Sequence, residues 1–323
     1  MTETFRTPRN QPLTRSTSAT GMLCMVIAMM LLPASDAFSK FLTAHLSPVE
    51  VTTLRLLAQG LCLLPVAVVM RHRLRGPMFS PIVALSGGLV MVTLTCLVWA
   101  FSLMPIATAI TIFFVEPLIL TLLAGPLLGE RVGPRRLAAV GVGLAGVLII
   151  IRPGGGLGPA ALLPLLAAVT YALNMIVLRR ATETRAGLTV QCGATFVAAA
   201  GMVILATGLA AAGGIDPALA DLSVPGWGAV LASGAFAAGS FVLIAEAFRR
   251  AEAGLLAPFQ YLEIVGATLA GYLVFAEFPD ALTWLGIAVI LGSGLYVFWR
   301  ERAPANRAIG RKGRRRALRV RPR

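Results

Sequence analysis

The chain has 323 residues, of which 57% are hydrophobic and only 13% are charged. A soluble protein of this length needs roughly a quarter of its residues charged, so the composition excludes an ordinary cytosolic enzyme, a secreted disulfide scaffold and a disordered protein. The net charge of +14 is typical of a nucleic-acid binder, but eleven of the 28 basic residues lie between Arg300 and Arg323, and most others lie in short gaps between apolar runs.

Ten apolar runs predict membrane helices, since a bilayer core requires about 20 mostly apolar residues per helix. The runs are 21–43, 48–70, 80–103, 106–128, 134–151, 159–178, 187–212, 225–248, 255–275 and 282–299. The predicted fold class is therefore an all-α integral membrane protein with ten transmembrane helices. Residues 1–20 form a polar N-terminal tail, and no cleavable signal peptide is evident because the first run is long and leads into further membrane segments.

Basic residues alternate between the two sides of this predicted topology. They occupy the N-terminal tail, the gaps after the second, fourth, sixth and eighth runs, and the tail at 300–323, whereas the other gaps contain only Arg152. Because Lys and Arg concentrate in cytoplasmic loops, both termini are predicted to be cytoplasmic. The expected location is the bacterial inner (cytoplasmic) membrane, crossed many times.

The second half of the chain repeats the first at an offset of 147 residues. The aligned identities are Ser86–Gly87 with Ser233–Gly234, Ala100–Phe101 with Ala247–Phe248, Glu116 with Glu263, Thr121–Leu122 with Thr268–Leu269, and Glu130 with Glu277. Each repeat contains five runs, and an odd number inverts the second copy in the membrane, as in many secondary transporters. The predicted domains are a first repeat at 21–152, a Gly-rich connector at 153–158 and a second repeat at 159–299.

Several segments of the two repeats match a known transporter family. They are Phe114–Leu123 and Leu128–Glu130 in the first repeat, and Tyr261–Glu263, Phe275–Glu277 and Leu282–Gly286 in the second. In these segments the chain resembles the EamA-type branch of the drug/metabolite transporter superfamily. The resemblance implies a helical basket with a central cavity lined mainly by helices 1–4 and 6–9, and with helices 5 and 10 at the periphery. It implies a metabolite as substrate, since such transporters carry amino acids, nucleobases, S-adenosylmethionine and other compounds.

Two glutamates inside the predicted spans are the main candidate site residues. An ionisable group at mid-bilayer costs at least about 2.5–3.5 kcal/mol on insertion scales. Glu116 and Glu263 lie near the midplane at equivalent repeat positions, Gln260 lies one turn before Glu263, and Pro117 is expected to kink its helix. A buried carboxylate can be neutral or charged near neutral pH, so the pair suits a proton-coupling site or a cationic substrate. The alternative is that each glutamate stays protonated and hydrogen-bonds a neighbouring helix.

Four other charged residues in the spans have both a functional and a structural interpretation. Arg55 can hold a substrate carboxylate or phosphate, pair with one of the two glutamates, or extend to the outer interface. Asp36 and Lys40 stand four residues apart in one run, so a mutual ion pair is favoured. Glu246 lies near the end of its run and is expected to pair with one of the two arginines that follow it.

Uncharged polar residues in the spans are weaker candidates. Ser39, Asn174 and Tyr171 lie in runs that correspond roughly between the two repeats, and they can offer hydrogen bonds to a substrate. Glu130 and Glu277 close the loops after the fourth and ninth runs, and they are expected to act as capping and loop partners for the helix that follows.

The sequence contains no pattern that indicates an enzyme, a metal site or a nucleotide site. The GxGxxG match at 141–146 lies inside a predicted membrane helix, where small residues allow close helix packing. The four cysteines have neither metal-ligand nor redox spacing. No P-loop, hydrolase or zinc-peptidase pattern is found, so no enzyme activity, cofactor or metal is predicted. The basic tail lacks interleaved aromatic residues, so no nucleic-acid partner is expected.

The predicted function is a secondary active transporter that moves a small polar metabolite, such as an amino acid or a nucleobase, by alternating access. Proton coupling through the two glutamates is part of this prediction. The alternatives are a lipid-carrier translocase and a passive facilitator or channel. The expected partners are the small-molecule substrate and membrane lipids, and a homodimer through the glycines of helices 5 and 10 stays open.

Overall fold

The computed structural model describes residues 15–129, 133–152, 157–214 and 222–297. In these ranges the chain is helical and contains no strand, which confirms the predicted all-α class. Every predicted apolar run is a helix or a pair of helices. Most of the predicted tails and of the Gly-rich connector, together with Glu130, lie outside the described residues.

The helices follow the predicted runs to within a few residues at most ends. They are α1 (Arg15–Leu42), α2 (Pro48–Val69), α3 (Pro81–Leu103), α4 (Ile106–Phe113), α5 (Glu116–Leu128), α6 (Pro134–Ile151), α7 (Leu162–Ala181), α8 (Gly187–Ala211), α9 (Val224–Arg250), α10 (Ala253–Gln260) and α11 (Leu262–Phe275). Two short 3₁₀ turns, η1 (Arg71–Arg73) and η2 (Gly158–Ala161), precede α3 and α7.

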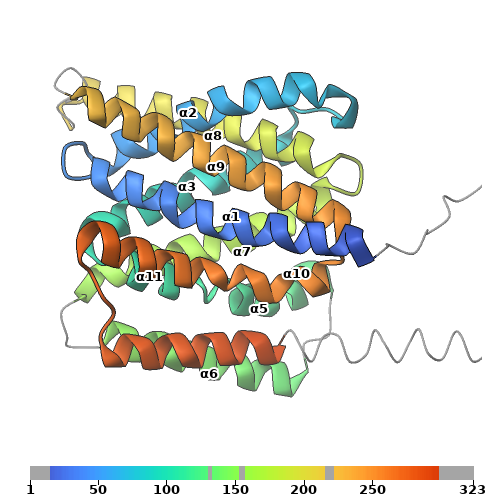
Figure 1. Ribbon diagram of the computed structural model, residues 1–323, viewed down its shortest axis with the longest axis vertical. Coiled ribbons are helices and arrows are strands. Elements are labelled where there is room, and N and C mark those ends of the chain that lie inside the picture. Colours follow the sequence, from blue (N-terminus) through green and yellow to red (C-terminus); the bar gives the residue numbers. More distant parts are fainter. Residues whose placement is uncertain (1–14, 130–132, 153–156, 215–221, 298–323) are drawn as a thin grey trace, which may run out of the picture.

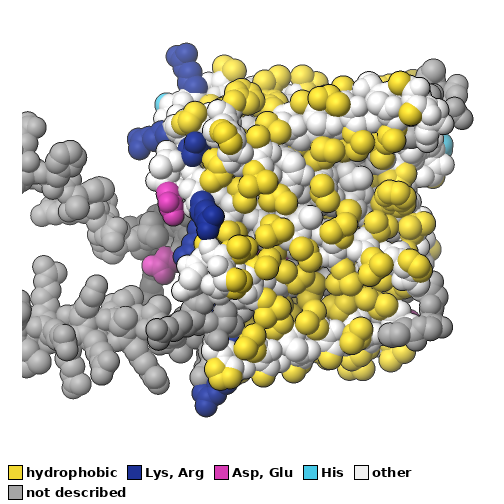
Figure 2. Space-filling model, turned by 180° about the vertical axis from the view of Figure 1, so that it is seen from behind, with side chains coloured by type: hydrophobic (Ala, Val, Ile, Leu, Met, Phe, Trp, Pro, Cys, Tyr) yellow, Lys and Arg dark blue, Asp and Glu magenta, His cyan; other side chains and the backbone are white. Residues whose placement is uncertain are grey.

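Within the described ranges, eight helical stretches are long and apolar enough to cross a membrane, and a shorter apolar helix spans Ala281–Val297. Their outer faces expose large apolar side chains, such as Leu61 (60% exposed) and Ile204 (72%), and so does α11 at Leu273 (69%). Figure 2 shows these apolar side chains over the visible face of the bundle, with Lys and Arg side chains gathered at one end. A surface of this kind belongs in lipid, so the protein is a multi-pass membrane protein.

Local sequence accounts for where several helices begin. Pro48, Pro81 and Pro134 stand in the first turns of α2, α3 and α6, where the missing N–H of proline would have no helical partner in any case. At α2 the Ser47 hydroxyl accepts from Glu50 N, and a Glu50 carboxylate oxygen accepts from Ser47 N at 2.9 Å. This capping box fixes the turn between α1 and α2.

Two predicted runs are interrupted, at equivalent places in the two repeats. α4 ends at Phe113 and α5 starts at Glu116, whereas α10 ends at Gln260 and α11 starts at Leu262. The offset of 147 residues relates Phe113 to Gln260. The kink expected at Pro117 is confirmed, because the proline ring removes one backbone hydrogen bond from the turn in which the helix breaks.

The first three helices of each repeat pack mainly on helices of the other repeat. α1 packs on α9 and α7 packs on α3, so the first helix of each repeat lies against the third helix of the other. In the same way α2 contacts α8 and α9, α8 contacts α2 and α3, and the interrupted helices pack on α1 and α7. α6 and the Ala281–Val297 helix lie together at one edge of the bundle (Figure 1).

The repeated Ser-Gly pair lies where the two halves meet. A Cβ atom on Gly87 would stand 2.7 Å from Val197 Cβ in α8, and one on Gly234 would stand 2.5 Å from Gln59 N in α2. Both values are far inside van der Waals contact, so the missing side chain sets how closely these helices approach. Repeat-equivalent glycines therefore perform the same packing task in each half.

The serine of each pair bonds the first helix of the other repeat. Ser86 Oγ donates to Asn174 Oδ1 in α7 at 2.6 Å, and Ser233 O in α9 accepts from Ser35 Oγ at 2.7 Å. All these side chains are buried. The predicted repeat therefore corresponds to matched contacts across the interface between the halves.

Glycines in the peripheral helices serve contacts within one chain. Gly146 in α6 would place a Cβ 3.0 Å from Ile290 Cγ1, and a Cβ on Gly286 would overlap Ile150. α6 and the Ala281–Val297 helix thus use these glycines to pack on each other. Gly141 and Gly292 have open space around them among the described residues.

The packing role of the two interface glycines can be tested by adding one methyl group. Gly87→Ala and Gly234→Ala are each expected to cost about 1–3 kcal/mol through overpacking, although alanine is the better helix former. Gly88→Ala is the matched control, because nothing lies within 4 Å of its Cβ position. Thermal unfolding in detergent should show lower midpoints for the first two variants only, and an equal midpoint for all three would refute the packing role.

Candidate functional site

The two interrupted helices hold the paired glutamates in their second halves. Glu116 is the first residue of α5, and Glu263 lies in the first turn of α11. Glu116 Oε1 is buried and has no hydrogen-bond partner among the described residues. Tyr171 of α7 lies within electrostatic range of both carboxylates. The two repeat-equivalent carboxylates therefore both lie on the side of their helices that faces Tyr171 of α7.

Four aromatic rings from the two helix breaks and α7 contact one another in a chain. The Phe113 ring lies 5.4 Å from the Tyr171 ring in an edge-on arrangement, and the Phe114 ring lies 5.7 Å from Tyr261. Phe113 and Phe114 touch each other with centroids 6.3 Å apart. Three of these residues flank the helix breaks, where the chain departs from regular helix. We refer to these four side chains as the aromatic cluster.

Arg55 pairs with Asp36, not with either glutamate or with the outer interface. Arg55 Nη1 donates to Asp36 Oδ1 at 2.8 Å and to Ser39 Oγ at 3.1 Å. The two charged side chains are only 4% and 7% exposed. The expected ion pair between Asp36 and Lys40 is therefore wrong, because α2 supplies a guanidinium that reaches the face of α1 carrying Asp36.

Two polar atoms beside this ion pair have no partner among the described residues. They are Arg55 Nε and Gln59 Oε1, one turn apart on α2 and both buried. Gln59 Nε2 donates to Thr195 Oγ1 at 3.3 Å, and Glu263 lies within electrostatic range of both Asp36 and Arg55. The buried polar groups of α2 thus keep one donor, Arg55 Nε, and one acceptor, Gln59 Oε1, without a partner among the described residues.

Lys40 has its partner in the second repeat. Lys40 Nζ donates to both carboxylate oxygens of Glu277 at 2.6 Å and to Met104 O at 3.0 Å, and it lies 5.2 Å from the centroid of the Phe275 ring. The left-handed Ala276 (φ 55°) ends α11 just before Glu277. The expected role of Glu277 as a helix cap is therefore wrong, since its side chain is bound to α1.

Asp280 caps the last described helix in place of Glu277. Asp280 Oδ1 accepts from Thr283 N at 3.0 Å, and Arg152 donates to the other carboxylate oxygen. Arg152, together with Thr283, holds the pKa of the Asp280 carboxyl below its usual range. These contacts stabilise the fold above the unfolded pKa of Asp280, and their contribution is lost as the pH falls through the lowered pKa.

The remaining sequence candidates lie in different places. Glu246 pairs with Arg250 at 2.6 Å and with Arg249, as predicted, and Arg73 adds a third contact at 3.3 Å. Asn174 accepts its hydrogen bond from α3, so it belongs to the interface between the repeats. Glu246 is thus placed apart from the paired glutamates, in a cluster of exposed charges.

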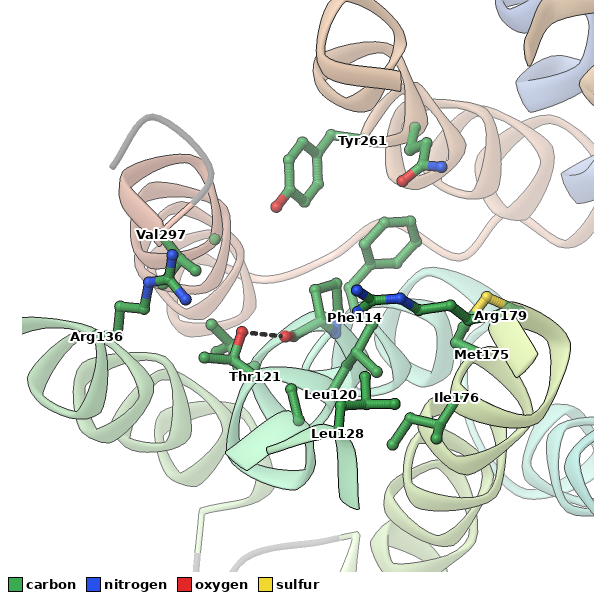
Figure 3. A pocket seen from close by; sticks show the side chains of 15 residues that line it. Phe114, Leu120, Thr121, Leu128, Arg136, Met175, Ile176, Arg179, Tyr261 and Val297 are labelled. Carbon is green, nitrogen blue, oxygen red and sulfur yellow. Dashed lines mark hydrogen bonds between the residues drawn. The ribbon is translucent and has the colours of Figure 1, made fainter. Parts of the chain in front are cut away.

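A cavity of about 270 Å³ borders the aromatic cluster. Gln260, Tyr261 and Phe114 line one part of it, and Arg136 and Arg179 line another. Figure 3 shows the two arginine side chains entering from opposite sides of the cavity, from α6 and α7. Of the predicted site residues, Gln260 is the one that lines this cavity.

Phe113, Phe114 and Tyr261 are the part of the aromatic cluster that sequence reasoning missed, whereas Tyr171 was a sequence candidate. Phe114 and Tyr261 stand in segments that carry the family resemblance, yet aromatic residues in apolar runs are ordinary lipid-facing or core residues. Their position beside the helix breaks is the signal that could have singled them out. Among the described residues, no group of three or more His, Cys, Asp or Glu side chains can hold a metal ion.

Comparisons with known proteins show the family of this chain. A profile described as the EamA-like transporter family matches residues 19–152 and 158–299. The chain is 34% identical to a riboflavin transporter of Rhizobium johnstonii over 62% of this chain and 66% of that protein. It is 26% identical to an S-adenosylmethionine uptake transporter of Rickettsia bellii over 91% of this chain and 98% of that protein. These similarities point to a transporter and not to an enzyme.

A solved crystal structure of a protein shares the fold. Its TM-score is 0.60 at 22% identity, and the match covers 85% of this chain and 95% of the other.

The buried ion pair gives a test of the network beside Glu263. Arg55→Gln is expected to destabilise the protein by about 3–5 kcal/mol, because it leaves Asp36 buried without its counter-charge. The double variant Arg55→Gln/Asp36→Asn should recover part of that loss. Arg73→Gln, which breaks an exposed pair, should cost less than about 1 kcal/mol. Chemical or thermal unfolding of the purified variants measures all three, and a double variant less stable than Arg55→Gln would contradict the pairing.

Proposed function

This chain belongs to the EamA-like transporter family, and from that premise we propose that it is a secondary transporter that moves a small polar metabolite by alternating access. The observation that carries the proposal is the pair Glu116 and Glu263, placed at equivalent helix breaks in two repeats. Interrupted helices near the membrane middle are where secondary transporters build substrate and ion sites. When the two repeats swap their conformations, the site opens first to one side of the membrane and then to the other.

We further propose ten crossings, with the second repeat inverted and both termini cytoplasmic. α10 and α11 together have the length of one crossing, and Ala281–Val297 supplies the last. The gathering of Lys and Arg side chains at one end of the bundle (Figure 2) supports a cytoplasmic assignment for that end. A bacterial inner membrane is the corresponding location, and domain limits at residues 21–152 and 159–299 accompany this topology.

The proposed substrate has a flat heteroaromatic ring. The aromatic cluster offers ring faces and edges for stacking, and the two carboxylates beside it suit a substrate with a positive charge or several hydrogen-bond donors. Relatives are named for riboflavin and for S-adenosylmethionine, and both compounds contain a fused heteroaromatic ring. A nucleobase or a nucleoside derivative meets the same description.

Glu116 and Glu263 are proposed to bind protons or the cationic group of the substrate. Glu116 Oε1 is buried without a partner among the described residues, which is expected of a group that waits for a ligand or a proton. Arg55 is already neutralised by Asp36 at 2.8 Å, so it is assigned a supporting role beside Glu263. The net charge of the site then depends on the protonation of the two glutamates.

Replacing each glutamate by its amide tests the coupling. Glu116→Gln and Glu263→Gln are each expected to abolish the dependence of uptake on an imposed pH gradient, because glutamine cannot exchange a proton. Proteoliposomes with a radiolabelled nucleobase, riboflavin or S-adenosylmethionine as probe measure this. Glu183→Gln is the matched control, since Glu183 is exposed in the loop after α7. Gradient-dependent uptake that persists in both single variants would remove the proton-coupling role.

The same vesicles separate the transporter from a passive facilitator. A secondary transporter accumulates the probe above the external concentration when the gradient is imposed, whereas a facilitator or channel only equilibrates it. Accumulation by the unmodified protein is the expected result.

The aromatic cluster gives a separate test of the substrate class. Tyr171→Leu and Phe113→Leu are each expected to weaken apparent affinity about two- to tenfold, the equivalent of one lost ring interaction. Tyr171→Phe keeps the ring and should retain most of the affinity. Concentration dependence of uptake measures these effects. Equal losses in Tyr171→Phe and Tyr171→Leu would show that the hydroxyl, and not the ring face, is used.

A further inference from the structure

The cavity beside the aromatic cluster is lined by residues along nearly the whole of α5. Its lining on α5 extends from Pro117 in the first turn to Leu128, the last residue of that helix. At a rise of about 1.5 Å per residue, this stretch of helix is about 16 Å long. Half of a hydrocarbon core about 30 Å thick is about 15 Å. The cavity thus has the depth of a single leaflet.

The lining is apolar along this depth and basic at its outer end. Leu118, Leu120 and Ile176 belong to the apolar part. Arg136 stands in the first turn of α6, and Arg179 stands in the last turn of α7. Both arginines therefore lie where helices end, at the level expected for lipid headgroups.

The cavity lies between the main bundle and the peripheral helices. α5 and α7 form one wall, and Arg136 of α6 with Val297 of the last described helix contributes to the other. Figure 1 shows α6 and that last helix side by side at the edge of the molecule. The cavity therefore lies between helices of both repeats, beside the peripheral pair and away from the contacts of α1 with α9 and of α3 with α7.

We propose that this cavity binds one anionic phospholipid, with an acyl chain along α5 and the phosphate between Arg136 and Arg179. A guanidinium carries five donors, so each arginine can hold phosphate oxygens in addition to the other contacts it makes. Basic pockets between membrane helices are suited to anionic headgroups. The end of the acyl chain would lie against Phe114 and Tyr261, beside the helix breaks.

Tyr261 connects the lipid site to the peripheral helix. The Tyr261 hydroxyl lies against Gly294, where any side chain would overlap it. The contact joins the break between α10 and α11 to the Ala281–Val297 helix. A bound lipid would therefore lie beside both the break between α10 and α11 and the Ala281–Val297 helix, which meet at Tyr261.

Lipid binding to the intact protein in a neutral detergent tests the proposal. Phosphatidylglycerol and phosphatidylcholine with identical acyl chains are titrated, and retained lipid is counted by native mass spectrometry alongside the thermal midpoint. The expected result is one tightly bound phosphatidylglycerol and a raised midpoint. Equal retention of phosphatidylcholine would overturn the headgroup assignment, and a full effect of inorganic phosphate alone would show that only an anion is bound.

Variants locate the site. Arg136→Gln/Arg179→Gln is expected to lower phosphatidylglycerol affinity about tenfold or more, because two charge-assisted contacts are lost. Arg135→Gln/Arg180→Gln removes the same charge from the adjacent positions, which do not line the cavity, and should keep the affinity. Ala124→Leu, which fills the apolar part without changing charge, should also weaken binding. Equal losses in both arginine pairs, or full affinity in Ala124→Leu, would refute binding in this cavity.

Discussion

The need to satisfy every polar group without water governs this structure. Lipid offers no hydrogen bonds, so backbone groups must bond within helices and each buried charge must find its partner on another helix. Arg55 of α2 meets Asp36 of α1, and Lys40 of α1 meets Glu277 after α11. Because the partners come from different helices, these pairs determine which helices can be neighbours. Glu116 Oε1, Arg55 Nε and Gln59 Oε1 depart from this rule, since none of these buried atoms has a partner among the described residues.

Close contact between the halves depends on residues that recur at the repeat offset. Gly87 and Gly234 let α3 and α9 approach the second helices of the opposite repeats. Their serine neighbours, Ser86 and Ser233, take part in hydrogen bonds to α7 and α1. An interface built twice from the same short motif can be rearranged with little change in its total contacts. That property is what an exchange between two equivalent conformations requires.

The proposed site is located where helical order fails. Two breaks at equivalent positions carry the carboxylates, and the rings of the aromatic cluster flank them. The long apolar cavity ends at the same rings, so the proposed substrate site and lipid site share Phe114 and Tyr261 as a common wall. Peripheral helices that pack through Gly146 and Gly286 then have a second role, as the outer wall of a lipid cavity.

Hydropathy along the chain was sufficient to predict the all-α class and the apolar helices, because lipid imposes a length and a composition on each helix separately. Residue identities at an offset of 147 predicted the repeat. Hydropathy and charge also singled out Glu116, Glu263 and the break at Pro117, since a carboxylate or a proline in an apolar run is visible without neighbours. Only the tertiary structure decided the partners of Asp36 and Lys40. A spacing of four residues favours a pair within one helix, but a buried guanidinium from α2 and a carboxylate after α11 compete for the same side chains. The aromatic cluster and the cavity are likewise formed by helices distant in sequence. No local sequence pattern predicts how these helices cross.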